Sequence, residues 1–286
     1  MSNPHLPVET LDHILDFLHD STHALRHCCL VSKSWIPHTR SHLFAEIRFR
    51  TAKNLDSWKD TFPDPSTSPA CFTKSLSVDC PQAVTAVDAE AGGWLRGFSR
   101  VVRFAVASHG FGYLPGGLPI SFVPFHGFSP VKYLRVDPLI LLTPQLSDLI
   151  FSFPLLEDLI VYTGARPVNN GEGPNGPQVV TQLSNSPACT GTLILSREAM
   201  AYIARRLLSI PGGIHFRELA LTWTDDRQLS LAMAIMEECL DTLEYLNISC
   251  ISPCASTLHL RRSQYLTPLS SRVEANFDQP LEGDET

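Results

Sequence analysis

The residues best suited to chemistry in this chain are histidines, and they gather near its start. Seven of the 11 histidines fall within the first 42 residues. Two pairs stand four residues apart, His23 with His27 and His38 with His42. On a helix this spacing places both rings on one face, where two imidazoles could begin a metal site. A zinc site needs three or four converging ligands, however, and the nearest further candidates along the chain are Cys28 and Cys29. We therefore expect solvated histidines, no metal and no cofactor.

Motifs for catalysis are missing from the sequence. It holds no glycine-rich phosphate loop, no Gly-x-Ser-x-Gly elbow, no His-Glu-x-x-His and no Cys-x-x-Cys pair. Trp223 beside Asp225 and Asp226 could form a pocket with paired carboxylates, but acidic residues at a helix start explain this group more simply. A hydrolase would also need a deep pocket with converging titratable groups. The sequence therefore favours a protein without catalytic residues of its own.

Composition and charge narrow the class of protein further. The 286 residues include 22 Lys and Arg against 29 Asp and Glu, a net charge of −7, which argues against a nucleic-acid or anionic-membrane partner. No apolar stretch approaches the roughly 18 residues of a membrane span. Eight cysteines are too few for a disulfide scaffold of this length. We expect a globular, intracellular protein, cytoplasmic or nuclear, with one or two domains.

The first 48 residues predict three short helices. Apolar residues recur at three- and four-residue steps, which places them on one helix face: Leu11, Ile14, Leu15 and Leu18. Pro7 suits the first turn of this helix, Asp20 or Ser21 can cap a second, and a third starts near Ser34. A segment of about 40 residues cannot build a full core of its own. The segment therefore looks like a docking module.

These residues resemble an F-box, a family whose pattern is a Leu-Pro, an acidic residue, an Ile/Leu stripe and a late Val-Ser-x-x-Trp. The matching residues are Leu6-Pro7, Glu9, Ile14, Leu15, Leu18, Val31-Ser32 and Trp35, within roughly residues 4 to 48. The resemblance implies docking on the S-phase-kinase-associated adaptor protein and, through it, on a cullin scaffold. The residues it implies for the adaptor contact, or for holding the helices together, are Leu6, Pro7, Ile14, Leu15, Leu18, Leu30, Val31 and Trp35. An unrelated helical cap is the alternative.

Beyond residue 70 a short strand pattern repeats. Apolar residues spaced as in Val101-Phe104-Val106 recur with centres at residues 76, 104, 134, 159, 193, 219 and 246. The steps between centres lie near the period of about 20–29 residues that is typical of leucine-rich repeats. Helical segments between them can start at Thr143, Ser196 and Asp225. Alternating strands and helices predict a parallel sheet with right-handed crossovers.

Residues 153–159, Phe-Pro-Leu-Leu-Glu-Asp-Leu, resemble the Pro-x-Leu-Glu-x-Leu signature of degenerate leucine-rich repeats in fungal F-box proteins. The expected fold is therefore α/β: a three-helix F-box, then a short, irregular leucine-rich-repeat-like solenoid with a parallel sheet. The expected divisions are a helical module at 1–48, a linker at 49–70, a repeat domain at 71–266 with a loop at 164–191, and a disordered tail at 267–286. The common repeat's asparagine after each strand is absent, and an ordinary layered α/β domain is the alternative.

Together the two resemblances imply a substrate-receptor subunit of an SCF-type ubiquitin ligase, which binds rather than catalyses. Polar and aromatic residues on one face of the sheet are the candidates for contact with an unknown target protein: Arg103, Tyr133, Arg135, Asp137, Asp158, Tyr162, Glu218, Tyr245 and Asn247. The alternative function is a repeat scaffold whose F-box-like segment only caps the first repeat. Leu6, Pro7 and Leu18 should be accessible in a docking module and packed inward in a cap.

Overall fold

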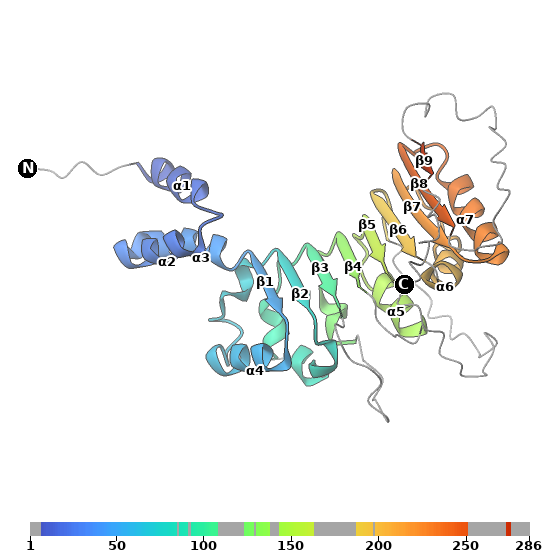
Figure 1. Ribbon diagram of the computed structural model, residues 1–286. Coiled ribbons are helices and arrows are strands. Elements are labelled where there is room, and N and C mark those ends of the chain that lie inside the picture. The colour runs from blue at the N-terminus through green and yellow to red at the C-terminus, as the bar shows by residue number, and fades with distance from the viewer. Residues whose placement is uncertain are drawn as a thin grey trace, which may run out of the picture. The chain divides into compact units, whose positions relative to one another are not determined.

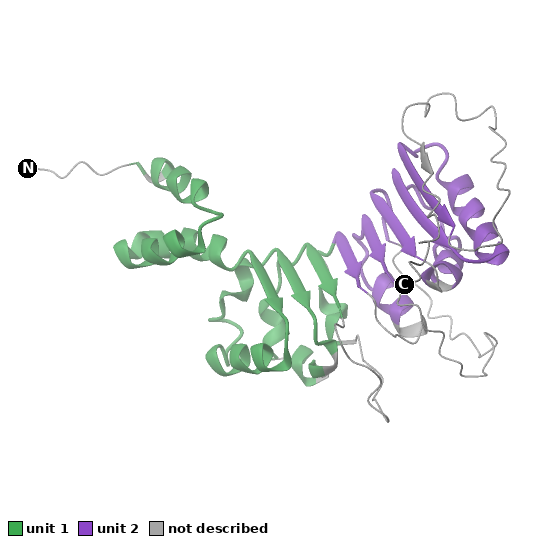
Figure 2. Cartoon of the chain, in the orientation of Figure 1, with its two compact units in different colours: residues 1–131 green, residues 132–286 purple. Residues whose placement is uncertain are grey.

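The protein is an α/β structure that divides into two compact units, residues 1–131 and 132–286 (Figure 2). The computed structural model describes residues 7–84, 86–90, 93–107, 123–128, 130–137, 143–162, 187–196, 198–250 and 273–275. The paired strands run parallel in both units. Among the helices of these ranges, none combines the length and apolar character needed to cross a membrane.

The first unit begins with three helices, as the sequence predicts. They are α1 (Val8–Phe17), α2 (Thr22–Val31) and α3 (Ile36–Leu43), with a 3₁₀ turn η1 (Lys33–Trp35) before α3. The carbonyl of Pro7 accepts the Thr10 N–H at 3.1 Å, and the Ser21 hydroxyl accepts the Ala24 N–H at 3.3 Å. Both predicted helix starts are confirmed, since these bonds satisfy N–H groups that the first turn leaves free.

The described residues in the rest of this unit form a three-stranded parallel sheet with one helix and several 3₁₀ turns. Its elements are β1 (Glu46–Phe49), α4 (Ala52–Thr61), η2 (Pro69–Phe72), β2 (Ser75–Val78), η3 (Pro81–Ala83), η4 (Ala86–Ala89), η5 (Trp94–Gly97), β3 (Arg103–Val106) and η6 (Val123–Gly127). An aromatic cluster forms the core, in which Phe49 packs edge-on against Trp58, Trp94 and Phe98, at ring-centroid distances of 5.7, 5.5 and 6.3 Å. This geometry is the favourable one for aromatic pairs.

The predicted linker at residues 49–70 is wrong, because α4 occupies much of it. Thr51 caps this helix, Leu55 is fully buried, and Trp58 joins the aromatic cluster. The remaining residues of the helix are mostly polar, and only Leu55 and Trp58 contribute large apolar side chains. Two such residues are too few to produce a recognisable helical periodicity. The strand β1, also not predicted, pairs with β2 from Glu46 onward.

The second unit alternates strands and helices. Its elements are β4 (Tyr133–Val136), α5 (Thr143–Phe151), β5 (Asp158–Val161), β6 (Thr192–Ser196), α6 (Glu198–Leu207), β7 (Glu218–Trp223), α7 (Asp226–Glu238), β8 (Tyr245–Cys250) and β9 (Val273–Ala275). The strands pair in chain order, and α5, α6 and α7 lie along one side of the sheet (Figure 1). All seven predicted strands are present, counting β2 and β3 of the first unit.

The centres of the predicted strands meet in register. Leu134 pairs with Leu159, which pairs with Leu193, and the row continues through Leu219 to Leu246. All five side chains are buried, the first four completely. Burying a leucine contributes roughly 1.5–3 kcal/mol, so this row of side chains under the helices fixes the strand register.

Two predicted irregular segments contain ordered residues. Within the predicted loop at 164–191, residues 187–191 are described: Cys189 is buried, and its N–H donates to the Leu156 carbonyl at 2.8 Å. Within the predicted tail, β9 pairs with β8, Val273 opposite Leu246. The rest of both segments, and Leu258 and Leu260, which the sequence suggested for one more strand, lie outside the described residues.

Candidate protein-docking site

Large apolar side chains are exposed on α1 and α2. Phe17 is 88% exposed, Leu30 83%, Val31 67% and Ile14 44%. A fully buried side chain of this size contributes roughly 1.5–3 kcal/mol, so each leaves a gain in stability unused while it faces water. A group of exposed apolar residues on one small helical segment is typical of a surface that another molecule covers.

Part of this surface is an open apolar groove along α1. Its lining residues are Thr10, His13, Ile14, Phe17 and Leu18. Thr10, Ile14 and Leu18 stand four residues apart, as do His13 and Phe17, so the five residues lie along one side of the helix. Among the α1 side chains that the structure describes, only Leu15 is buried, on another face. Helix α1 therefore packs on the unit through a narrow contact and presents a second apolar stripe outward.

The predicted adaptor-contact residues fall into three groups. Pro7, Ile14, Leu30 and Val31 are exposed, Leu18 and Trp35 are half-buried, and Leu15 is only 1% exposed. Leu6 lies outside the described residues. Leu15 therefore holds the helices together rather than lining a contact. The structure adds Phe17, which the sequence reasoning missed because it lies off the stripe that runs through Leu11 and Leu15.

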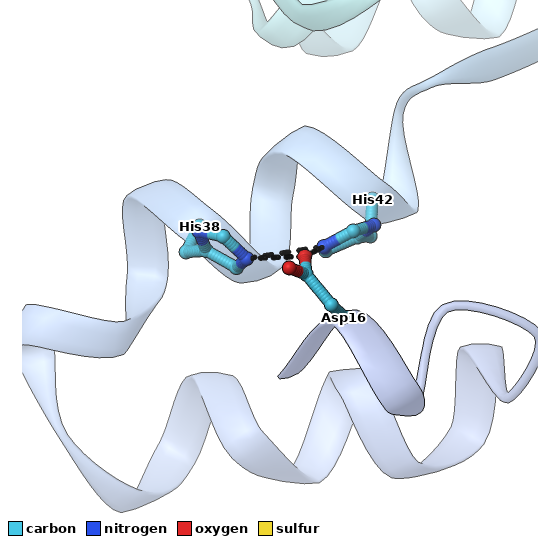
Figure 3. Close-up of side chains that lie close together, drawn as sticks. All are labelled: Asp16, His38 and His42. Carbon is cyan, nitrogen blue, oxygen red and sulfur yellow. Dashed lines mark hydrogen bonds and ion pairs between the residues drawn. The ribbon is translucent and has the colours of Figure 1, made fainter. Parts of the chain in front are cut away.

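The same helices bring together an aspartate and two histidines. Asp16 of α1 points between His38 and His42 of α3 (Figure 3). One oxygen of Asp16, Oδ1, lies 2.9 Å from the Nε2 atoms of both rings, and these two nitrogens are 3.2 Å apart. The sequence shows the histidine spacing, but the third member comes from another helix. Asp12 and Asp16 also stand four residues apart, but this spacing alone does not join either of them to His38 or His42.

A second carboxylate faces the other side of one ring. Asp12 Oδ1 lies 3.3 Å from Nδ1 of His38, so this imidazole stands between two aspartates. The hydrogen bond from His38 is the main reason that the pKa of Asp16 lies below its usual value, and the bond from His42 acts in the same direction. Charge-assisted bonds to an ionised carboxylate favour its charged form.

Seven of the nine residues predicted for target contact lie on strands, on the face opposite the buried side chains, and Asp137 and Tyr162 directly follow β4 and β5. Arg103, in the first unit, is exposed, as are Arg135, Tyr162 and Glu218 in the second. The others are partly exposed: Tyr133, Asp137, Asp158, Tyr245 and Asn247. Because side chains alternate along a strand, the leucine row fixes which residues face out. The structure thus places these side chains on an open surface of each unit.

Several of these residues already have partners within the chain. Arg135 donates from Nε to Asp137 Oδ1 at 2.9 Å, and its guanidinium lies 5.6 Å from the centre of the Tyr162 ring. Partial burial, which outweighs the neighbouring Arg135 charge, raises the pKa of Tyr133. Asp158 Oδ1 accepts the Thr192 N–H at 2.6 Å, so this carboxylate stabilises the start of β6.

Comparisons with known proteins give no family for this chain. No protein-family model matches it, and searches of curated proteins and of solved structures find no significant similarity.

Proposed function

We propose that this chain is a substrate-receptor subunit of an SCF-type ubiquitin ligase. In this proposal α1–α3 form an F-box that docks on the S-phase-kinase-associated adaptor protein and, through it, on a cullin scaffold. The parallel sheet is an irregular leucine-rich-repeat array that binds a target protein. The chain brings the target to the ligase and raises its effective concentration there, while other subunits transfer ubiquitin.

The observation that carries the proposal is the exposure of apolar side chains on α1 and α2. Pro7 of the F-box pattern directly precedes α1, Val31 is the last residue of α2, and Trp35 is the last residue of η1, just before α3. A partner that covered Ile14, Phe17 and Leu30 would bury the kind of surface that forms the core of an interface. Sequence pattern and exposed surface therefore agree on the same segment.

The same observation separates docking from the alternative, in which the helices only cap the first repeat. A cap should turn Leu6, Pro7 and Leu18 inward, against the chain's own strands. Pro7 is exposed and Leu18 is half-buried on the edge of the groove, while Leu6 lies outside the described residues. The positions that can be compared favour docking, as do the stronger exposures of Phe17 and Leu30.

A pull-down with the purified adaptor protein tests the proposal. The full chain should retain the adaptor, and two double variants, Leu6→Ala/Pro7→Ala and Phe17→Ser/Leu30→Ser, should retain far less. The matched control is Met233→Ser/Leu240→Ser, which removes side chains that are 40% and 47% exposed in the second unit. This control should retain the adaptor fully.

Both serine variants replace exposed residues, so each should remain folded. Circular dichroism of each variant verifies this before the pull-down. Equal recovery of adaptor by all variants, or recovery by none including the unmodified chain, would count against the ligase assignment.

A further inference from the structure

We propose that Asp16, His38 and His42 form a binding site for a transition-metal ion of the zinc type, which fastens α1 to α3. The site goes beyond the proposed adaptor docking and does not depend on it. Two imidazole nitrogens and one carboxylate oxygen are ligands that zinc takes in proteins. Among the residues that the structure describes, no other group of three histidine, cysteine or acidic side chains brings its ligand atoms together in this way.

The distances between the three atoms are close to those of a zinc site. Zinc bonds of about 2.0–2.2 Å in a tetrahedron place neighbouring ligand atoms about 3.3–3.6 Å apart. The two Nε2 atoms are 3.2 Å apart here, and each is 2.9 Å from Asp16 Oδ1. A widening of a few tenths of an ångström would admit the ion, with a water molecule as the fourth ligand. Asp16 is exposed and His38 and His42 are half-buried, so the ion can reach the site from solvent.

A carboxylate on the other side of the His38 ring gives a second reason. Asp12 Oδ1 lies 3.3 Å from Nδ1 of His38, whereas Nε2 of the same ring faces Asp16. Histidines that bind a metal through one ring nitrogen commonly have a carboxylate beside the other, which orients the ring. Asp12 stands at the place of such an outer-sphere partner for an ion bound at Nε2.

The position of the site gives the ion a structural role. Helix α1 has Leu15 as its buried contact among the side chains described, and its outward stripe carries the docking groove. A metal ion that joins Asp16 of α1 to two residues of α3 adds a cross-link where this packing is narrow. Imidazole ligands favour Zn²⁺, Cu²⁺, Ni²⁺ or Co²⁺ over Mg²⁺ and Ca²⁺, which prefer oxygen.

The test is a titration of the full chain, freed of metal by a chelator, with ZnCl₂ alone and without adaptor. The unmodified chain should bind one Zn²⁺ at this site. The variants His38→Gln/His42→Gln and Asp16→Asn should lose at least about 10-fold in zinc affinity, and Asp12→Asn should lose about 10- to 100-fold, as outer-sphere partners do. MgCl₂ in excess should not compete.

The chain supplies a matched control in His23 and His27. These rings also stand four residues apart on one helix, with their Nε2 atoms 3.2 Å from each other, but no described carboxylate joins them. The variant His23→Gln/His27→Gln should bind Zn²⁺ as the unmodified chain does. Cys28 and Cys29 are intact in every variant, so binding by thiols affects all samples equally.

Circular dichroism and the melting temperature distinguish loss of the metal site from loss of the fold. Circular dichroism shows whether each variant is folded, and Asp16→Asn preserves the shape of the side chain it replaces. Zn²⁺ should raise the melting temperature of the unmodified chain and of the His23→Gln/His27→Gln variant, but not that of His38→Gln/His42→Gln. Equal zinc affinity for both histidine variants, or no binding by the unmodified chain, would overturn the site. Neither result bears on adaptor docking.

Discussion

Helices α1–α3 and the sheet of the second unit use their apolar residues in opposite ways. In the sheet, Leu159, Leu193 and Leu219 are fully buried in one row. In the helices, Phe17 and Leu30 are 88% and 83% exposed. Helices α6 and α7 pack on β6 and β7, where they supply a second layer over this part of the row. The three short helices cover Leu15 and Leu25 but leave Phe17 and Leu30 facing water.

The difference shows that an apolar residue is evidence about the fold where it is buried and evidence about binding where it is exposed. A leucine in the sheet reports on the fold, because its removal opens a cavity in a packed layer. In the proposed function, Phe17 on α1 reports on adaptor binding, because its removal leaves the folded chain nearly unchanged. Stability and adaptor retention should therefore respond to different sets of substitutions.

The largest expected effect is that of a core substitution in the second unit. Phe216, which is fully buried, should cost about 3–5 kcal/mol in free energy of unfolding when replaced by alanine. The matched substitution Phe17→Ala should change stability by less than about 0.5 kcal/mol, since that side chain faces water. Urea unfolding followed by circular dichroism measures both. A large loss for Phe17→Ala would mean that α1 packs more tightly than its exposure indicates.

The next effect concerns buried thiols and high pH. Burial raises the pKa of Cys189 to about 12 and that of Cys239 to about 11, from 9.0. Because the folded-state pKa lies above the unfolded one, each thiol favours the folded state below pH 9.0, and this contribution is lost as pH rises toward 12 for Cys189 and toward 11 for Cys239. Stability should therefore fall above pH 9, by at most about 1.4 kcal/mol per pH unit for each thiol.

Alkylation of the native chain, followed by mass spectrometry, compares the accessibility of the thiols on α2 with that of the buried thiols in the second unit. Cys28 and Cys29 on α2 are partly exposed and should react first, while Cys189 and Cys239 should react after unfolding. The variant Cys189→Ala should show a shallower loss of stability with pH than the unmodified chain. An unchanged pH dependence in that variant would rule out this thiol as its source.

How far the sequence predicts this structure depends on where the burial comes from. The strand centres at Leu134, Leu159 and Leu219 could be found because each strand carries its own apolar pattern and a helix layer covers it. Helix α4 could not, because its half-buried Trp58 packs on aromatic residues outside the helix, among them Phe49 and the distant Phe98. A long-range cluster leaves no local periodicity.

The proposed docking surface and the histidine cluster also differ in whether the local sequence could predict them. Ile14, Leu30 and Val31 could be named from a pattern within one short segment, and the structure leaves all three exposed. Asp16 could not be joined to His38 from the sequence, since the contact spans 22 residues and depends on how α1 lies against α3. Which solvent-facing residues bind a target is a property of the partner, so the polar face of the sheet stays a prediction.

Helix caps provide a smaller effect that compares the two regions directly. Asp225 Oδ1 accepts the Gln228 N–H of α7 at 2.9 Å, whereas the Ser21 hydroxyl accepts the Ala24 N–H of α2 at 3.3 Å. Asp225→Ala should cost about 1 kcal/mol, and Ser21→Ala should cost less, because its bond is longer and its side chain carries no charge. Asp225→Asn, which preserves the cap, is the control. Thermal unfolding of the variants measures the order, and a larger loss for Ser21→Ala would reverse it.

The smallest effect lies on the open face of the sheet. The guanidinium of Arg135 lies 5.6 Å from the Tyr162 ring centre, an arrangement worth about 0.5–1 kcal/mol at an exposed site. A double-mutant cycle with Arg135→Met and Tyr162→Leu should therefore give a coupling energy of about that size. Asp137 remains in every variant. Its bond to Arg135 is therefore present both with and without Tyr162, and its energy cancels from the coupling energy. A coupling near zero would show that the two side chains are independent in solution. The face would then have to order both side chains when a target binds, and the entropic cost would count against Arg135 and Tyr162 as contact residues.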